Sequence, residues 1–90
     1  MKAVIVSGRF KRDYKAFKNN VIVETDLREV IAFLQNGEEL PHKFKDHSLI
    51  GEFLGCRDCH LLNDIVLIYE CKDEEIKLMR IGNHSNVFKR

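Results

Sequence analysis

Histidines and charged side chains in the second half of this 90-residue chain are the groups best suited to chemistry. His60 follows Asp58 by two positions, and in an extended segment this spacing puts both side chains on one face, with Cα atoms about 7 Å apart. Asp64 comes next, and Arg80 precedes His84 by four positions. Histidine suits either role in proton transfer because its ordinary pKa is about 6.5.

Histidines, carboxylates and an arginine together could cleave RNA without a metal ion. A base would accept the proton of the ribose 2′-OH, an acid would protonate the 5′-oxygen, and a cation would stabilise the charge on phosphorus. Structural explanations compete with this one: Asp64 could cap a turn, and Arg80 could pair with Glu70 or Asp73. We assign His42 no role in chemistry. From the residues alone, a nuclease is one candidate.

The segment from Cys56 to His60 matches the C-x-x-C-H pattern of haem attachment or half of a zinc site. Cys56 and Cys59 are three positions apart, so in a strand their thiols point to opposite faces. No second pair of ligands with zinc spacing is present in the sequence. Cys71 makes the count odd, which argues against a disulfide framework. We therefore expect reduced cysteines, no metal and no cofactor.

The composition predicts one domain over residues 1–90. Hydrophobic residues make up 44% and charged residues 32%, a balance that excludes a disordered chain. No apolar run approaches the roughly 20 residues of a membrane span, and the N-terminal apolar stretch is too short for a signal peptide. We expect a cytoplasmic protein without a membrane partner.

Charge is unevenly distributed, although the net charge is only +1. Residues 1–20 carry six basic residues and one acidic residue, whereas residues 21–40 carry one basic and five acidic residues. The basic segment could bind an anionic partner, or it could be an ordinary solvated helix surface. Its candidate contact residues are Lys11, Arg12, Lys15 and Lys18.

The first half of the chain predicts a strand and two helices. Residues 2–6 are a β-branched run, and Phe10, Tyr14 and Phe17 then follow at helical spacing. We expect that first helix to end near residues 19–20. A second helix is expected to begin at Asp26, where Asp and Glu are spaced as in a capping box, and to end before Gly37.

The second half predicts a loop and three strands. Residues 38–52 are polar and are expected to be irregular. Residues 53–61, 64–69 and 75–81 are the expected strands, the last two joined as a hairpin by the charged turn 72–74. The tail 82–88 is expected to be turn-like. The order β-α-α-β-β-β indicates an α+β fold, with a helical hairpin on one face of an antiparallel sheet and the other face free for function.

The chain from residue 45 onward resembles the RelE/YafQ family of bacterial type II toxins, and within it the YafQ branch. The matching segments, in chain order, are Lys45-Asp46-His47-Ser48-Leu49, Gly51, Arg57-Asp58-Cys59-His60, Asp64-Ile65-Val66-Leu67-Ile68-Tyr69, Arg80-Ile81-Gly82-Asn83-His84-Ser85 and Phe88. Together they cover about half of the chain. Each segment is weak evidence alone, and their order within so short a chain makes the resemblance specific.

The resemblance implies an endoribonuclease that cuts mRNA on the ribosome, in contact with 16S rRNA. It also implies inhibition by a cognate antitoxin of the RelB/DinJ type, in a heterotetramer. It suggests His47 as general base, His84 as general acid and Arg80 as the cation that stabilises the phosphate. Essential orienting residues would be His60 and Asp64. Supporting positions would be Asp58 and Phe88, the latter stacking on a base. Lys11, Arg12, Lys15 and Lys18 would contact RNA or the ribosome.

Two departures accompany this resemblance. Cys56 and Cys59 flank the Arg-Asp pair, and the net charge of +1 is low for a protein that grips ribosomal RNA. Three other functions remain open: a ParE-like toxin that acts on DNA gyrase, a metal- or haem-binding module, and a catalytically decayed paralogue that only binds an antitoxin.

Overall fold

The computed structural model describes residues 1–62 and 64–88. The chain forms an α+β fold with a five-stranded sheet in the order β1-β5-β4-β3-β2. The elements in chain order are β1 (Ala3–Val6), α1 (Gly8–Tyr14), the 3-10 turn η1 (Lys15–Phe17), α2 (Val21–Gln35), η2 (His42–Phe44), β2 (His47–Ser48), η3 (Gly51–Phe53), β3 (Arg57–His60), β4 (Ile65–Cys71), β5 (Glu75–Asn83) and α3 (His84–Val87). The predicted fold class is confirmed, and the edge strand β1 adds a parallel pairing with β5.

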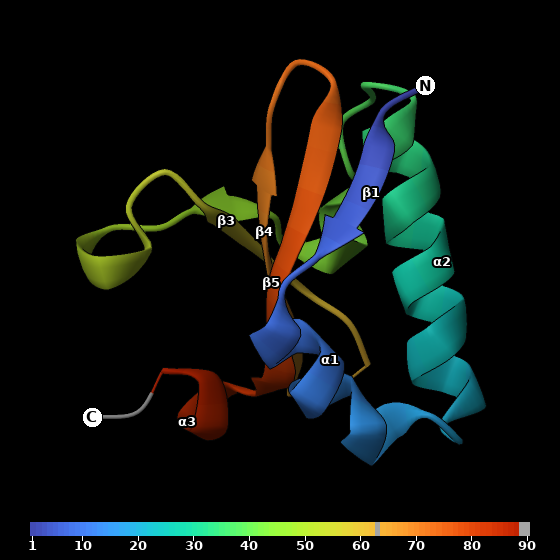
Figure 1. Ribbon diagram of the computed structural model, residues 1–90. Coiled ribbons are helices and arrows are strands. Elements are labelled where there is room, and N and C mark those ends of the chain that lie inside the picture. Colours follow the sequence, from blue (N-terminus) through green and yellow to red (C-terminus); the bar gives the residue numbers. More distant parts are fainter. Residues whose placement is uncertain (63, 89–90) are drawn as a thin grey trace.

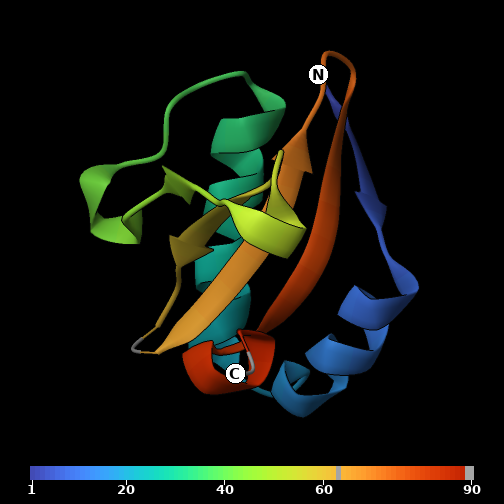
Figure 2. The same ribbon diagram turned by 90° about the vertical axis from the view of Figure 1, so that its left-hand side faces the viewer.

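The sheet has one face covered by α2 and one face that carries only short segments. Figure 1 shows α2 on one side of the strands and the loop with η3 on the other. The main core lies beneath the helices and includes Phe10, Val23, Leu67 and Tyr69. A smaller cluster on the other face contains Cys56, Val66, Ile68 and Val87. In Figure 2, α1 lies beside the part of β5 that β1 does not reach.

The second helix begins five residues before Asp26, so the predicted start is wrong. Asn20 is the N-cap of α2, and its side chain accepts the backbone N–H of Val23 at 3.1 Å. The same asparagine was expected to end the first helix, which in fact finishes at Tyr14 and continues as η1. The predicted C-terminus is correct: Gly37 has φ of 71°, and its N–H donates to the carbonyl of Leu34 in a Schellman motif.

Three predicted segments of the second half are shorter or more ordered than expected. The strand expected over 53–61 is limited to β3, because Gly55 takes a left-handed φ of 94° and breaks the extended chain before Cys56. The expected loop 38–52 contains β2, which pairs with β3. The tail expected to be turn-like instead extends β5 to Asn83 and then forms α3. The hairpin of β4 and β5 is confirmed.

Within the described part of the chain, none of the helices combines the length and the apolar character that a bilayer crossing requires.

Candidate active site

β2 and β3 bring His47, Asp58 and His60 together on the less covered face of the sheet. His47 and Asp58 are direct partners in the antiparallel register, and His47 Nδ1 lies 3.1 Å from Asp58 Oδ1. The ring centroids of His47 and His60 are 6.3 Å apart. The predicted placement of Asp58 and His60 on one face is thus confirmed, with His47 added from the neighbouring strand.

α3 supplies His84 and Phe88 to the same surface. The backbone N–H of His84 donates to the carbonyl of Asp64 at 3.2 Å, so the end of β5 is tied to the start of β4. The rings of His84 and Phe88 are 4.8 Å apart, and Phe88 meets Phe53 edge-on at 5.9 Å. His84 is exposed, so its ring is open to a ligand. A single helical turn therefore presents an acid–base group beside an aromatic face.

Asp58 is the buried centre of this cluster, only 1% exposed. Burial raises the pKa of Asp58 above its ordinary value, and the charges of His47, His60 and His84 act in the opposite direction without cancelling it. Its Oδ1 atom accepts no hydrogen bond of good geometry from the described residues. The three histidines thus surround a carboxyl group that is both desolvated and incompletely bonded, which is typical of functional sites.

His47 has a second neighbour that fixes its ring. Its Nδ1 lies 3.0 Å from the carbonyl oxygen of Lys45. Lys45 adopts a left-handed conformation with φ of 49°, which is uncommon for a residue with a side chain. A proton on Nδ1 would be donated to this carbonyl, and Nε2 would then be free to accept a proton from a substrate.

Behind His47, a polar network that the sequence analysis missed anchors the loop. Asp46 accepts hydrogen bonds from Arg57 Nε and Nη2 at 3.0 and 2.9 Å, and also from the hydroxyl of Tyr69. The hydrogen bond to Asp46 raises the pKa of Arg57, and burial followed by the same carboxylate raises that of Tyr69. These contacts join residues far apart in sequence and fix the residue that precedes His47.

An open cleft of about 540 Å³ lies next to this network, and the only histidine in its lining is His42, which is outside the cluster. Leu34, Leu40, Arg57 and Tyr69 are among its lining residues, whereas His47, His60 and His84 are not. His47 and His84 are exposed and His60 is half-buried, so the cluster lies on a surface that a macromolecule can reach.

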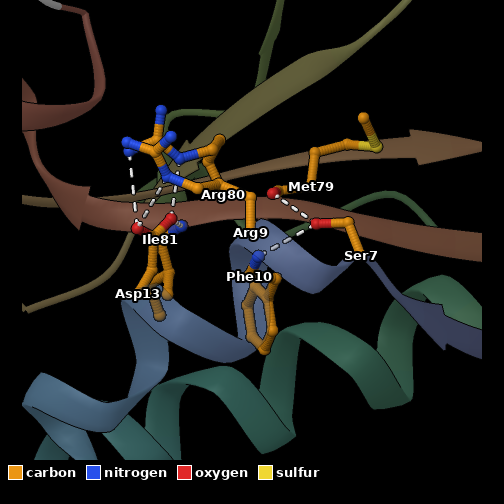
Figure 3. Close-up of polar contacts among 7 residues, drawn as sticks. All are labelled: Ser7, Arg9, Phe10, Asp13, Met79, Arg80 and Ile81. Atoms are coloured by element: carbon orange, nitrogen blue, oxygen red, sulfur yellow. Dashed lines mark hydrogen bonds and ion pairs between the residues drawn. The ribbon is translucent and has the colours of Figure 1, made fainter.

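Arg80 makes a contact that was not expected. Its Nε donates to Asp13 Oδ2 at 2.7 Å (Figure 3), so an ion pair does form, but with Asp13 and not with Glu70 or Asp73, the alternatives considered from the sequence. Its position in the sheet nevertheless matches the site: Arg80 lies opposite Ile68, which lies opposite Asp58 on the next strand. The structure thus gathers His47, Asp58, His60, His84 and Phe88, keeps Asp64 beside His84, and places Arg80 in the same row of the sheet.

The cysteines behave as their spacing predicts. Cys59 is buried in the main core, and Cys56 lies in the cluster on the opposite face. Burial raises the pKa of both thiols, which keeps them protonated. Among the residues that the structure describes, no three His, Cys, Asp or Glu side chains are arranged to hold a metal ion.

Residues 2–89 match the family model described as the bacterial toxin of a type II toxin-antitoxin system, YafQ. The chain belongs to the YafQ family of type II toxins. A relative from Haemophilus influenzae that carries the YafQ name is 41% identical, over 91% of this chain and 87% of its own length. The mRNA interferase toxin YafQ of Escherichia coli K12 is 32% identical, over 91% of this chain and 90% of its own length.

Solved structures of the family share the whole fold. YafQ in the E. coli DinJ-YafQ complex matches with a TM-score of 0.84 and 30% identity, covering 98% of this chain and 99% of that one. A copper-bound mutant toxin from Helicobacter pylori matches with a TM-score of 0.89 and 35% identity, covering 98% and 100%. The present chain therefore has the YafQ-type fold, and the family relation supports an endoribonuclease type of activity.

Proposed function

We propose that this toxin cleaves mRNA on the ribosome by attack of a ribose 2′-OH on the adjacent phosphate. The observation that carries the proposal is the convergence of His47, His60 and His84 around buried Asp58 on an exposed surface. The name of the E. coli relative, an mRNA interferase, supports the same activity. The side chains of this surface can supply each proton and each charge that the reaction requires.

In the proposed step, His47 Nε2 takes the proton of the 2′-OH while the 2′-oxygen forms a bond to phosphorus. The bond from phosphorus to the 5′-oxygen breaks, and His84 donates a proton to that oxygen. Arg80 stabilises the charge that builds on the phosphate. His60 and Asp58 hold the rings and balance their charge, Asp64 fixes His84 through its carbonyl, and Phe88 offers a face for a base.

Binding to the ribosome is assigned to the basic side of α1 and η1. Lys11, Arg12, Lys15 and Lys18 are exposed, and among the described residues none of the four forms an ion pair. Unpaired cations suit rRNA phosphates. The complex of E. coli YafQ with DinJ supports a RelB/DinJ-type antitoxin as the other partner, and we retain the heterotetramer as its expected form.

The test is cleavage of a defined mRNA by the purified toxin, with and without ribosomes. We expect cuts only on ribosome-bound message, with a 2′,3′-cyclic phosphate on one product and a 5′-hydroxyl on the other. Equal cutting of free and bound RNA would contradict the ribosome requirement. Products with a 5′-phosphate would contradict attack by the 2′-OH.

A further inference from the structure

Where β1 ends, residues of α1 and its N-cap form hydrogen bonds with the edge of β5. β1 pairs with only the first four residues of β5. At the last of these, Leu78, the backbone N–H of Ser7 donates to the carbonyl at 2.9 Å, and one residue further along β5 the Ser7 hydroxyl donates to the carbonyl of Met79 at 2.8 Å. Asp13 Oδ2 then accepts the backbone N–H of Ile81 at 3.1 Å. Side chains at both ends of α1 thus replace the missing strand (Figure 3).

Asp13 is therefore held in place by the backbone of β5, and it holds Arg80 in turn. Its Oδ2 accepts Arg80 Nε at 2.7 Å, and its Oδ1 lies 3.4 Å from Arg80 Nη2. The two side chains are only 13% and 15% exposed. A two-point contact of a carboxylate with one edge of a guanidinium fixes the plane of the guanidinium, which a single contact would not do.

A β-bulge in β5 determines the face of the sheet on which the Arg80 side chain leaves the strand. The β4–β5 register shifts between Ile68 and Tyr69, which leaves Met79 as the extra residue in β5. Met79 packs against the small cluster on the less covered face, and Arg80 lies opposite Ile68 of that cluster. Ile68 lies opposite Asp58 of β3, so Arg80, Ile68 and Asp58 form one row across three strands. Asp58 is the centre of the histidine cluster.

The pair leaves part of the guanidinium free. Arginine has five N–H groups, and Asp13 occupies the edge formed by Nε and Nη2; no other side chain of the described residues hydrogen-bonds the guanidinium, so the Nη1 side can donate to a phosphate oxygen. Burial by itself would raise the pKa of Asp13, but hydrogen bonds from Arg80 and Ile81 and the charges of Arg80 and Arg9 lower it. Asp13 is thus an anion wherever the toxin is folded at neutral pH.

We propose that Asp13 is a positioning residue of the cleavage site: it orients Arg80 so that the free edge of its guanidinium meets the phosphate of the bound message. This inference rests on the proposed function. It differs from a purely structural tie between α1 and β5, because such a tie would affect stability without changing the chemical step.

The experiment compares Asp13→Asn with the parent in single-turnover cleavage of ribosome-bound mRNA. Asparagine keeps the size and an acceptor oxygen for Ile81 but loses the charge that holds Arg80. Removing a direct donor to the transition state costs about 10²- to 10³-fold, so a misoriented one should cost about tenfold in rate, with the half-saturating toxin concentration unchanged. Asp13→Glu, which keeps the charge, should recover part of the rate.

Ser7→Ala is the matched control on the same helix. It removes the hydroxyl bond to Met79 and the cap of α1, so it should lower the melting temperature, yet the cleavage rate of the folded protein should not change. In an Arg80→Ala background, Asp13→Asn should cause no additional loss, because its effect passes through that arginine.

The outcomes separate the two proposals. If Arg80→Ala and His84→Ala cleave like the parent, the catalytic roles in the proposed function are wrong. If both are impaired but Asp13→Asn is not, only the positioning role is wrong. An additional loss in the Arg80→Ala background would also overturn it. Should Asp13→Asn fail to fold, Arg80→Lys takes its place: lysine keeps the charge but cannot form the forked contact, so an unchanged rate would overturn the inference.

Discussion

Asp58 and Cys59 are neighbours in β3, and both are almost inaccessible to solvent, but they face opposite sides of the sheet. Cys59 is packed under the helices among apolar residues such as Leu67 and Tyr69. Asp58 lies on the other side, ringed by three histidines and with one oxygen lacking a hydrogen bond from the described residues. One face thus stabilises the fold by apolar burial, whereas the other keeps charged groups in an unfavourable setting that chemistry can use.

The largest expected difference between the faces is that a substitution on one face lowers the cleavage rate, whereas a substitution on the other lowers the stability. His84→Ala should lower mRNA cleavage by about 10²- to 10⁴-fold, because it removes the proposed general acid, and should leave the melting temperature nearly unchanged since His84 is exposed. Leu67→Ala, in the covered core, should instead lower the free energy of unfolding by about 2–5 kcal/mol and spare the cleavage rate of the folded protein.

His42→Ala is the control for the first variant, because His42 is also exposed but lies in η2, outside the cluster. Cleavage and thermal unfolding of all three proteins check the pattern. A His84→Ala protein that folds normally and cleaves mRNA like the parent would contradict the role of His84 as general acid.

A smaller effect is expected for stability at Asp58 and Cys59. Replacing Asp58 should raise the free energy of unfolding, whereas replacing Cys59 on the other face should lower it. Because the pKa of Asp58 is raised in the folded state, its ionised form opposes folding at neutral pH, and this penalty fades as the pH falls toward the unfolded value of 3.8. Asp58→Asn should therefore raise the free energy of unfolding at pH 7, while it impairs cleavage.

Urea unfolding of parent and Asp58→Asn between pH 4 and pH 7 measures this difference. The stabilisation should be largest at pH 7 and should shrink toward pH 4. Cys59→Ser, next in the strand, is the comparison: it buries a hydroxyl in the apolar core and should destabilise at both pH values. Destabilisation by Asp58→Asn at pH 7 would show that the carboxylate stabilises the fold instead.

Local patterns predicted most of the fold and much of the site. The alternation expected for an extended segment puts Asp58 with His60 and predicts the separation of Cys56 from Cys59, although Cys56 lies just before β3, and the apolar run of β4 marks a central strand. The two-residue β2 and the single turn α3 were missed because such short elements have no measurable period. The contacts of Asp13 with Arg80 and of Asp46 with Tyr69 were missed because they depend on the tertiary arrangement, not on spacing.

The smallest expected effect lies outside both faces, on the basic side of α1. Phe10 of this helix is buried and stacks with Tyr14, while Lys11 and Lys15 project to solvent, so Lys11→Ala with Lys15→Ala should leave stability unchanged. If each lysine neutralises one rRNA phosphate, each loss should flatten the log–log salt dependence of ribosome binding by about one unit, or less on single strands. Cleavage at saturating toxin should change little, because neither lysine belongs to the histidine cluster.

Ribosome co-sedimentation over a salt series is the measurement. Lys43→Ala with Lys72→Ala is the matched control, since it removes equal charge from lysines that pair with Glu29 and Glu70 elsewhere on the surface. Equal slopes for both double variants would show that the basic side of α1 is merely solvated; a flatter slope for the first alone would place ribosome binding on α1, apart from the face that carries the chemistry.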